Sequence, residues 1–69
     1  MKAYRNLPAD IVHLAYDSVD SSLCGMMANI DSRIGAGTCM DISLGRSLQY
    51  LRQITTCAKC VNISKEIAQ

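Results

Sequence analysis

The short segment Gly35-Ala36-Gly37 constrains the fold of this chain most, because glycines end helices and permit the dihedral angles of a tight turn. On both sides of it, apolar residues recur at intervals of three and four, as on one face of an α-helix. The predicted helices extend over about residues 7–34 and 39–63, with a loop over residues 35–38. The sequence therefore predicts an all-α fold, a two-helix αα-hairpin, as a single domain over residues 1–69.

Residues typical of helix starts support both predicted boundaries. Asn6 can cap the first helix, Pro8 suits its first turn, and Asp10 lies where the helix dipole favours an anion. Thr38-Cys39-Met40-Asp41 resembles a capping box, with Asp in place of the usual Glu or Gln. The second helix is therefore expected to begin near Cys39.

The apolar positions define a seam that one hairpin leaves partly uncovered. A chain of 69 residues is marginal for a self-sufficient core, and two hairpins packed face to face complete one as a four-helix bundle. We therefore expect a homodimer, since twofold dimers are the commonest closed assembly. The core and dimer seam is predicted to contain Val12, Tyr16, Val19, Leu23 and Ile30 from the first helix and Leu44, Leu48, Leu51 and Ile54 from the second.

Charge and hydropathy exclude several classes of protein. Seven basic residues oppose six acidic ones, so the formal net charge of +1 gives no global bias toward nucleic acid or an anionic membrane. No stretch approaches the roughly 20 apolar residues that span a bilayer, and Met1–Arg5 lacks the apolar run of a signal peptide. We expect a soluble cytoplasmic protein with no membrane partner, in which the four cysteines stay reduced.

The cysteines raise the question of a metal. Cys57-Ala58-Lys59-Cys60 is a single C-x-x-C pair, whereas structural zinc needs four ligands. An antiparallel hairpin brings His13 near Cys60 but leaves Cys24 and Cys39 nearer the loop. A site would then have three ligands per chain, or would need a second chain. Small buried thiols are the simpler interpretation, so we predict no metal and no cofactor, while metal binding by His13, Cys57 and Cys60 stays open.

Catalytic chemistry is not indicated. A redox thiolate needs the N-terminal end of a helix, and the prediction places Cys57 and Cys60 late in the second helix. Gly35-Ala36-Gly37-Thr38 lacks the strand and lysine of a phosphate-binding loop. We therefore predict a non-enzymatic protein with no catalytic residues.

Function by protein–protein interaction is the leading hypothesis. The chain is expected to bind a larger protein and modulate or inhibit it, as small antagonists encoded by phages and mobile elements do. The predicted partner-binding residues are the large basic, aromatic and thioether side chains Arg46, Tyr50, Arg52, Met26 and Met27.

The alternative is a small dimeric nucleic-acid-binding transcriptional regulator. Arg52 and Lys59 lie seven residues apart, on one face of the predicted second helix, with Arg46 close by. A solvated basic face explains the same residues, because the chain is nearly neutral overall.

Overall fold

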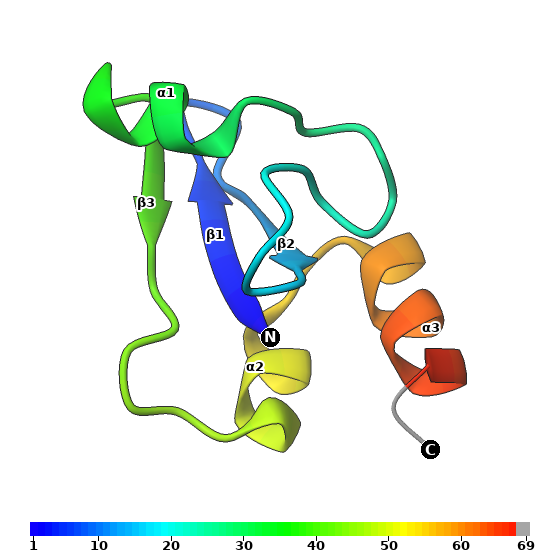
Figure 1. Cartoon of the computed structure of the whole chain (residues 1–69). Coiled ribbons are helices and arrows are strands. Elements are labelled where there is room, and N and C mark those ends of the chain that lie inside the picture. The colour runs from blue at the N-terminus through cyan, green and yellow to red at the C-terminus, as the bar shows by residue number, and fades with distance from the viewer. Residues whose placement is uncertain (68–69) are drawn as a thin grey trace.

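The computed structural model describes residues 1–67, and within that range the chain forms a small antiparallel sheet flanked by short helices (Figure 1). Strand β1 (Lys2–Asn6) lies in the middle, between β2 (Ile11–Ala15) and β3 (Cys39–Asp41). The helices are α1 (Ile30–Gly35), α2 (Leu48–Ile54) and α3 (Ala58–Ile67). This α+β architecture shows that the all-α prediction is wrong.

The predicted helix over residues 7–34 is replaced by a β-hairpin, a long loop and α1. In the hairpin, β1 pairs antiparallel with β2, from Lys2 opposite Ala15 to Asn6 opposite Ile11. Ile11–Ala15 is a nearly continuous apolar run, which suits a strand buried on both faces as well as a helix. The apolar pattern alone could not distinguish a strand from a helix at these residues. They form a strand because they pair with β1.

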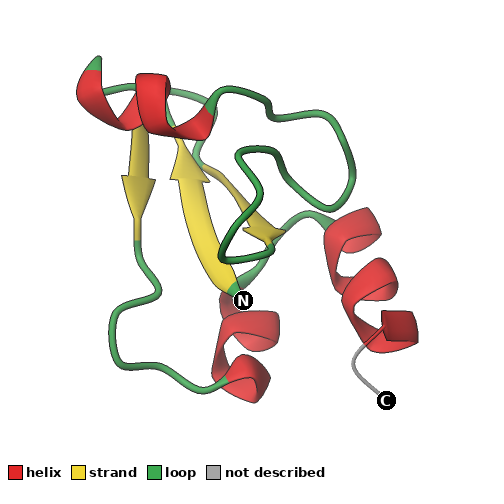
Figure 2. Cartoon of the chain, in the orientation of Figure 1, coloured by secondary structure: helices red, strands yellow, loops and turns green. Residues whose placement is uncertain are grey.

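The connection between β2 and α1 is irregular (Figure 2). A backbone hydrogen bond from Leu23 N–H to Leu14 O (2.7 Å) ties it to β2, and one from Ser22 N–H to Met27 O (2.7 Å) closes a turn within it. Gly25 takes a left-handed conformation (φ 77°) in its tight turn. The glycine-rich turn after residue 34 does end a helix, but that helix is only the six-residue α1.

The predicted second helix over residues 39–63 is also wrong, because three separate elements occupy that range. Its first residues form β3, and Gly45 (φ 68°) lies in the loop that follows. Helix α2 begins after Ser47, whose hydroxyl accepts a hydrogen bond from Tyr50 N–H. After α2 the extended Thr55 interrupts the helix, with its hydroxyl donating to Leu51 O (2.6 Å), and Thr56 Oγ1 accepts a bond from Val12 N–H (2.9 Å). Thr55 thus caps the end of α2, and Thr56 bonds to β2 instead of continuing a helix.

The core lies on both faces of the sheet rather than along a helical seam. One cluster contains Ala3, Val12, Leu14, Cys24, Leu51 and Cys60, and the other contains Tyr4, Ala15, Met27, Ile30 and Cys39. Of the predicted seam, Val12, Ile30 and Leu51 are buried; Leu23, Leu48 and Ile54 are half-buried; and Tyr16, Val19 and Leu44 are exposed. Without two long helices these residues form no continuous apolar stripe. The predictions of a helical hairpin and of a four-helix bundle are therefore both wrong.

Among the described residues, none of the helices has the length and apolar character needed to cross a bilayer.

Candidate metal centre

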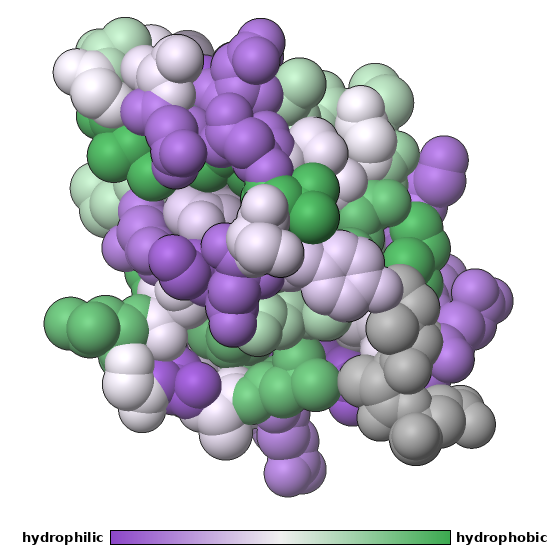
Figure 3. Space-filling view, in the orientation of Figure 1, coloured by the Kyte–Doolittle hydropathy of each residue, from purple (hydrophilic) through white to green (hydrophobic). Residues whose placement is uncertain are grey.

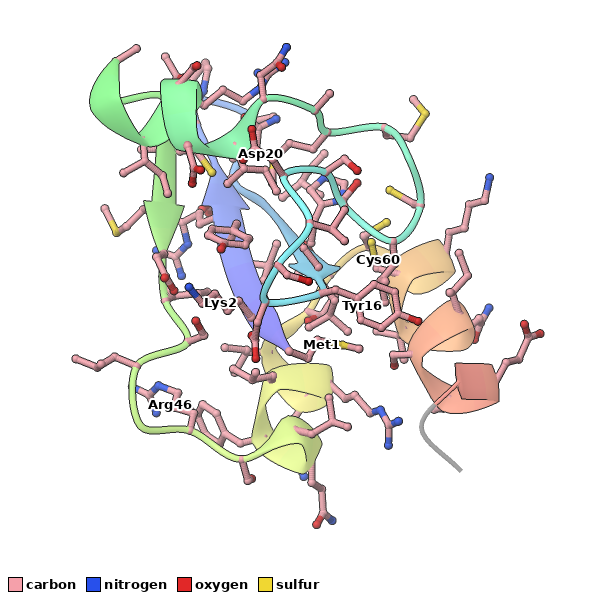
Figure 4. The ribbon with its side chains drawn as sticks, viewed as in Figure 1. Met1, Lys2, Tyr16, Asp20, Arg46 and Cys60 are labelled. Atoms are coloured by element: carbon pink, nitrogen blue, oxygen red, sulfur yellow. The ribbon has the colours of Figure 1, made fainter. Side chains whose placement is uncertain are left out.

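Four side chains with metal-ligating atoms converge beside the sheet. They are His13, Cys24, Cys57 and Cys60, and their nitrogen and sulfur atoms all lie within 4.8 Å of one another. Figure 4 shows sulfur atoms gathered near the labelled Cys60, where α3 faces β2 and the long loop. Three segments far apart in the sequence thus supply one Cys3His set.

His13 comes from the middle of β2. Its backbone is held in the hairpin opposite Tyr4 of β1, and Val12 and Leu14 on either side of it pack in the same apolar cluster as Cys24 and Cys60. His13 is buried, and its Nδ1 lies 3.4 Å from Cys24 Sγ and 3.6 Å from Cys60 Sγ. The rigid hairpin therefore fixes the nitrogen ligand.

Cys24 comes from the tight turn of the long loop. Its Sγ lies 3.2 Å from Ser22 Oγ and accepts a hydrogen bond from Met26 N–H at 3.5 Å. The left-handed Gly25 between Cys24 and Met26 gives the turn its sharp bend. The Met26 N–H points at the sulfur, and the Ser22 hydroxyl can also donate to it once the thiol has lost its proton, so both stabilise the thiolate that a metal ligand requires.

Cys57 and Cys60 lie at the start of a helix, which corrects the prediction that placed them late in one. Cys57 directly precedes α3, and its carbonyl accepts from Val61 N–H (3.1 Å). Cys57 N–H donates to Val12 O (3.1 Å), which holds this end of α3 against β2. The break at Thr55 and Thr56 created the new helix start, where the helix dipole favours thiolates.

The distances fit tetrahedral zinc. With Zn–S near 2.3 Å and Zn–N near 2.05 Å, a tetrahedral site places sulfur and nitrogen ligands about 3.6 Å apart. The observed separations from His13 Nδ1 to Cys24 Sγ and Cys60 Sγ are 3.4 and 3.6 Å. Three soft thiolates and one imidazole form a common set for structural zinc. The residues present therefore fit Zn²⁺.

The thiols differ in acidity. Burial raises the pKa of Cys60 to about 12. Burial also acts to raise the pKa of Cys24, but hydrogen bonds, chiefly from Ser22 and Met26, outweigh it and lower that pKa to about 6. Because zinc binds the thiolate form, binding must release the proton of Cys60.

Cys39 lies apart from this cluster. It is buried beside Tyr4 and Ile30 in the other apolar cluster, and burial raises the pKa of its thiol. Cys39 is thus a packed core thiol.

The predicted partner-binding residues are dispersed over several elements. The Arg46 guanidinium stacks over the Tyr50 ring at 4.5 Å from its centroid. Arg52 joins α2 to α3, donating to Ser64 Oγ (3.0 Å) and Ser64 O (2.8 Å). Met27 is buried at 2% exposure, whereas Met26 is 79% exposed. Arg52 thus has a structural role, which weakens the nucleic-acid alternative that relied on it.

No model of a protein family, no curated protein and no solved structure matches the chain. The functional interpretation therefore depends on the Cys3His cluster itself.

Sequence reasoning brought His13 near Cys57 and Cys60 but missed Cys24. On the predicted helix, Cys24 lies eleven residues from His13, a separation of roughly 16 Å at 1.5 Å per residue. The signal that could have found it is the turn-forming composition of residues 17–25, Asp-Ser-Val-Asp-Ser-Ser-Leu-Cys-Gly. Those residues favour a loop that returns to the strand.

Proposed function

We propose that this protein is a zinc-binding domain in which His13, Cys24, Cys57 and Cys60 hold one structural Zn²⁺. The observation that carries the proposal is the convergence of four ligand atoms within 4.8 Å, three of them thiols. Four protein ligands close a tetrahedral site and leave no position for a substrate. This supports a non-enzymatic role.

The metal would act as the main cross-link of the fold. It would join β2, the long loop and α3, three elements connected otherwise by a small apolar cluster and a few hydrogen bonds. Chains of this size usually need such a cross-link to gain more than roughly 3–5 kcal/mol of stability. The zinc site would therefore supply the stability that the apolar seam predicted from a dimer interface.

Elemental analysis tests the proposal. Protein purified without chelator is expected to contain one zinc per chain, and the Cys57→Ser/Cys60→Ser double variant much less. Native mass spectrometry of the same samples would confirm the stoichiometry. Wild-type protein that contains no stoichiometric zinc, and takes none up from added Zn²⁺, would overturn the proposal.

We propose further that the domain works as a protein-interaction module and that its first partner is a second copy of itself. Strand β3 is an edge strand: Leu7 N–H donates to Thr38 O (2.8 Å) and Ile42 N–H donates to Ala3 O (3.0 Å). In an antiparallel ladder the alternate peptide groups, those of Cys39 and Asp41, then point away from β1. They are free to pair with another strand.

The outer edge of β3 is complementary to itself. A twofold axis at Met40 would place Cys39 of one copy opposite Asp41 of the other, with the hydrogen-bonding groups of both facing inward. Met40 is half exposed, and Leu44 in the loop that follows is 94% exposed. Figure 3 shows green, apolar atoms beside purple, hydrophilic ones on the face of the molecule that it draws. Pairing through β3 would extend the sheet across the dimer.

Sedimentation velocity tests the dimer. Proline at position 41 removes an outward N–H without touching the ladder to β1, whereas alanine retains it. Zinc-loaded wild-type protein and Asp41→Ala are expected to sediment as dimers, and Asp41→Pro as a zinc-containing monomer. A monomeric wild-type protein at micromolar concentration, or an Asp41→Pro variant that dimerises equally well, would contradict pairing through β3.

Four unpaired thiols also support a reducing compartment, for which we propose the cytoplasm.

A further inference from the structure

We propose that Cys57 is the thiolate through which hydroperoxides oxidise the zinc site and release its metal. This inference rests on the zinc site proposed above and deepens it, since it assigns a modification site and a class of reactant to one particular ligand.

Two of the three sulfur ligands are shielded. Cys24 Sγ is covered by Ser22 Oγ at 3.2 Å and by Met26 N–H at 3.5 Å. Cys60 is completely buried, with Leu14 O 3.8 Å from its sulfur. Hydrogen bonds and burial both reduce the access of an oxidant to a zinc-bound sulfur.

Cys57 differs from both. It is half-buried, and no backbone N–H or hydroxyl of residues 1–67 donates to its sulfur. It also lies in the wall of an open pocket of about 640 Å³. Its wall also contains His13, Met26 and Met27. A small oxidant can therefore reach the metal centre from one side, and among the three cysteine ligands Cys57 is the one that lines this pocket.

The chemistry at Cys57 follows from its place at the start of α3. A thiolate that precedes a helix, with a second cysteine three residues later, is the arrangement of redox-active C-x-x-C pairs. The Cys57 thiolate attacks one oxygen of the hydroperoxide, the O–O bond breaks, and hydroxide (or alkoxide) leaves, which gives a sulfenic acid. The Cys60 thiolate then attacks the sulfenic sulfur, forms the disulfide and displaces a second hydroxide.

The two steps balance. Two thiolates lose two electrons in total, and one hydrogen peroxide molecule is reduced to two hydroxide ions, which the buffer protonates to water. A disulfide is a poor ligand for Zn²⁺. Because Cys57 and Cys60 then no longer bind the metal, only His13 and Cys24 remain as ligands and the zinc is released. The cross-link between β2, the loop and α3 is then broken, and a dithiol reductant with added Zn²⁺ would restore it.

Mass spectrometry after a short alkylation pulse tests which sulfur is exposed to reactants. Zinc-loaded protein, with its metal content measured first, is treated with less than one equivalent of N-ethylmaleimide and digested. Cys57 is expected to react at least about tenfold faster than Cys24 or Cys60. Modification of Cys24 or Cys60 first, or of all three at one rate, would overturn the assignment. A sample without zinc would instead show that the zinc proposal itself had failed.

A pair of matched variants tests the role of Cys57 in oxidation. Cys57→His and Cys24→His both retain four ligands, as a Cys2His2 set, but only Cys57→His removes the exposed thiolate. Hydrogen peroxide is added, and zinc release is followed with a chromophoric chelator. The wild-type protein and Cys24→His are expected to release zinc at least about tenfold faster than Cys57→His. Equal rates for Cys57→His and the wild-type protein would contradict the inference, and the alkylation pulse on wild-type protein decides the matter if either variant fails to fold.

Discussion

Removal of zinc by excess chelator is expected to unfold the protein. The apolar clusters of a chain this short give little stability alone, whereas structural zinc contributes about 10–16 kcal/mol of apparent binding free energy in small zinc domains at neutral pH. The cooperative thermal transition seen by circular dichroism should disappear, and the dispersed amide resonances should collapse to the narrow range of an unfolded chain. Both should return when Zn²⁺ is added in excess of the chelator.

The control for this experiment is chelator that has already been saturated with zinc. It should leave the spectrum and the midpoint of unfolding unchanged. If the chelated protein keeps dispersed resonances and the same midpoint, the fold does not depend on a metal, and the Cys3His cluster is only a group of packed side chains.

Replacement of Cys24 is expected to have the second largest effect. Cys24→Ala removes one of four ligands, and zinc affinity should fall by more than the 10- to 100-fold that is typical when only a neighbour of a ligand is changed. Competition titration against a chromophoric chelator measures this affinity. The matched control is Cys39→Ala, because Cys39 is also a buried thiol but packs in the other apolar cluster. Its zinc affinity should stay within a few-fold of the wild-type value.

Cys24→Ala also separates the two site compositions that the sequence allowed. If His13, Cys57 and Cys60 bound the metal with a ligand from a second chain, Cys24→Ala would retain wild-type affinity. Dimerisation would then require zinc. Retained affinity in this variant would therefore contradict the four-ligand site within one chain.

Two features predicted from the sequence are present in the structure, the turn at Gly35–Gly37 and the proximity of His13 to Cys60. Only the first is present for the physical reason that predicted it. The turn at Gly35–Gly37 is present, because glycine ends α1 as it would end a longer helix. His13 does lie near Cys60, but through packing of α3 on β2 and not through an antiparallel pair of helices. The proximity was predicted by an incorrect geometry.

The fold class could not be predicted because the decisive interactions are non-local. Ile11–Ala15 suits a buried strand or a helix, and only its pairing with Lys2–Asn6 makes it a strand. Thr56 leaves the helical pattern because its hydroxyl accepts a bond from Val12, forty-four residues away. The same return of distant segments brings Cys24 to the metal centre, so a regular spacing of ligands was never visible.

X-ray absorption spectroscopy at the zinc edge, on protein purified without chelator, tests the central claim most directly. The account predicts one zinc per chain with three sulfur neighbours at about 2.3 Å and one nitrogen neighbour at about 2.0–2.1 Å. A shell of nitrogen and oxygen atoms alone, or a sulfur count that is unchanged in Cys24→Ala, would contradict it.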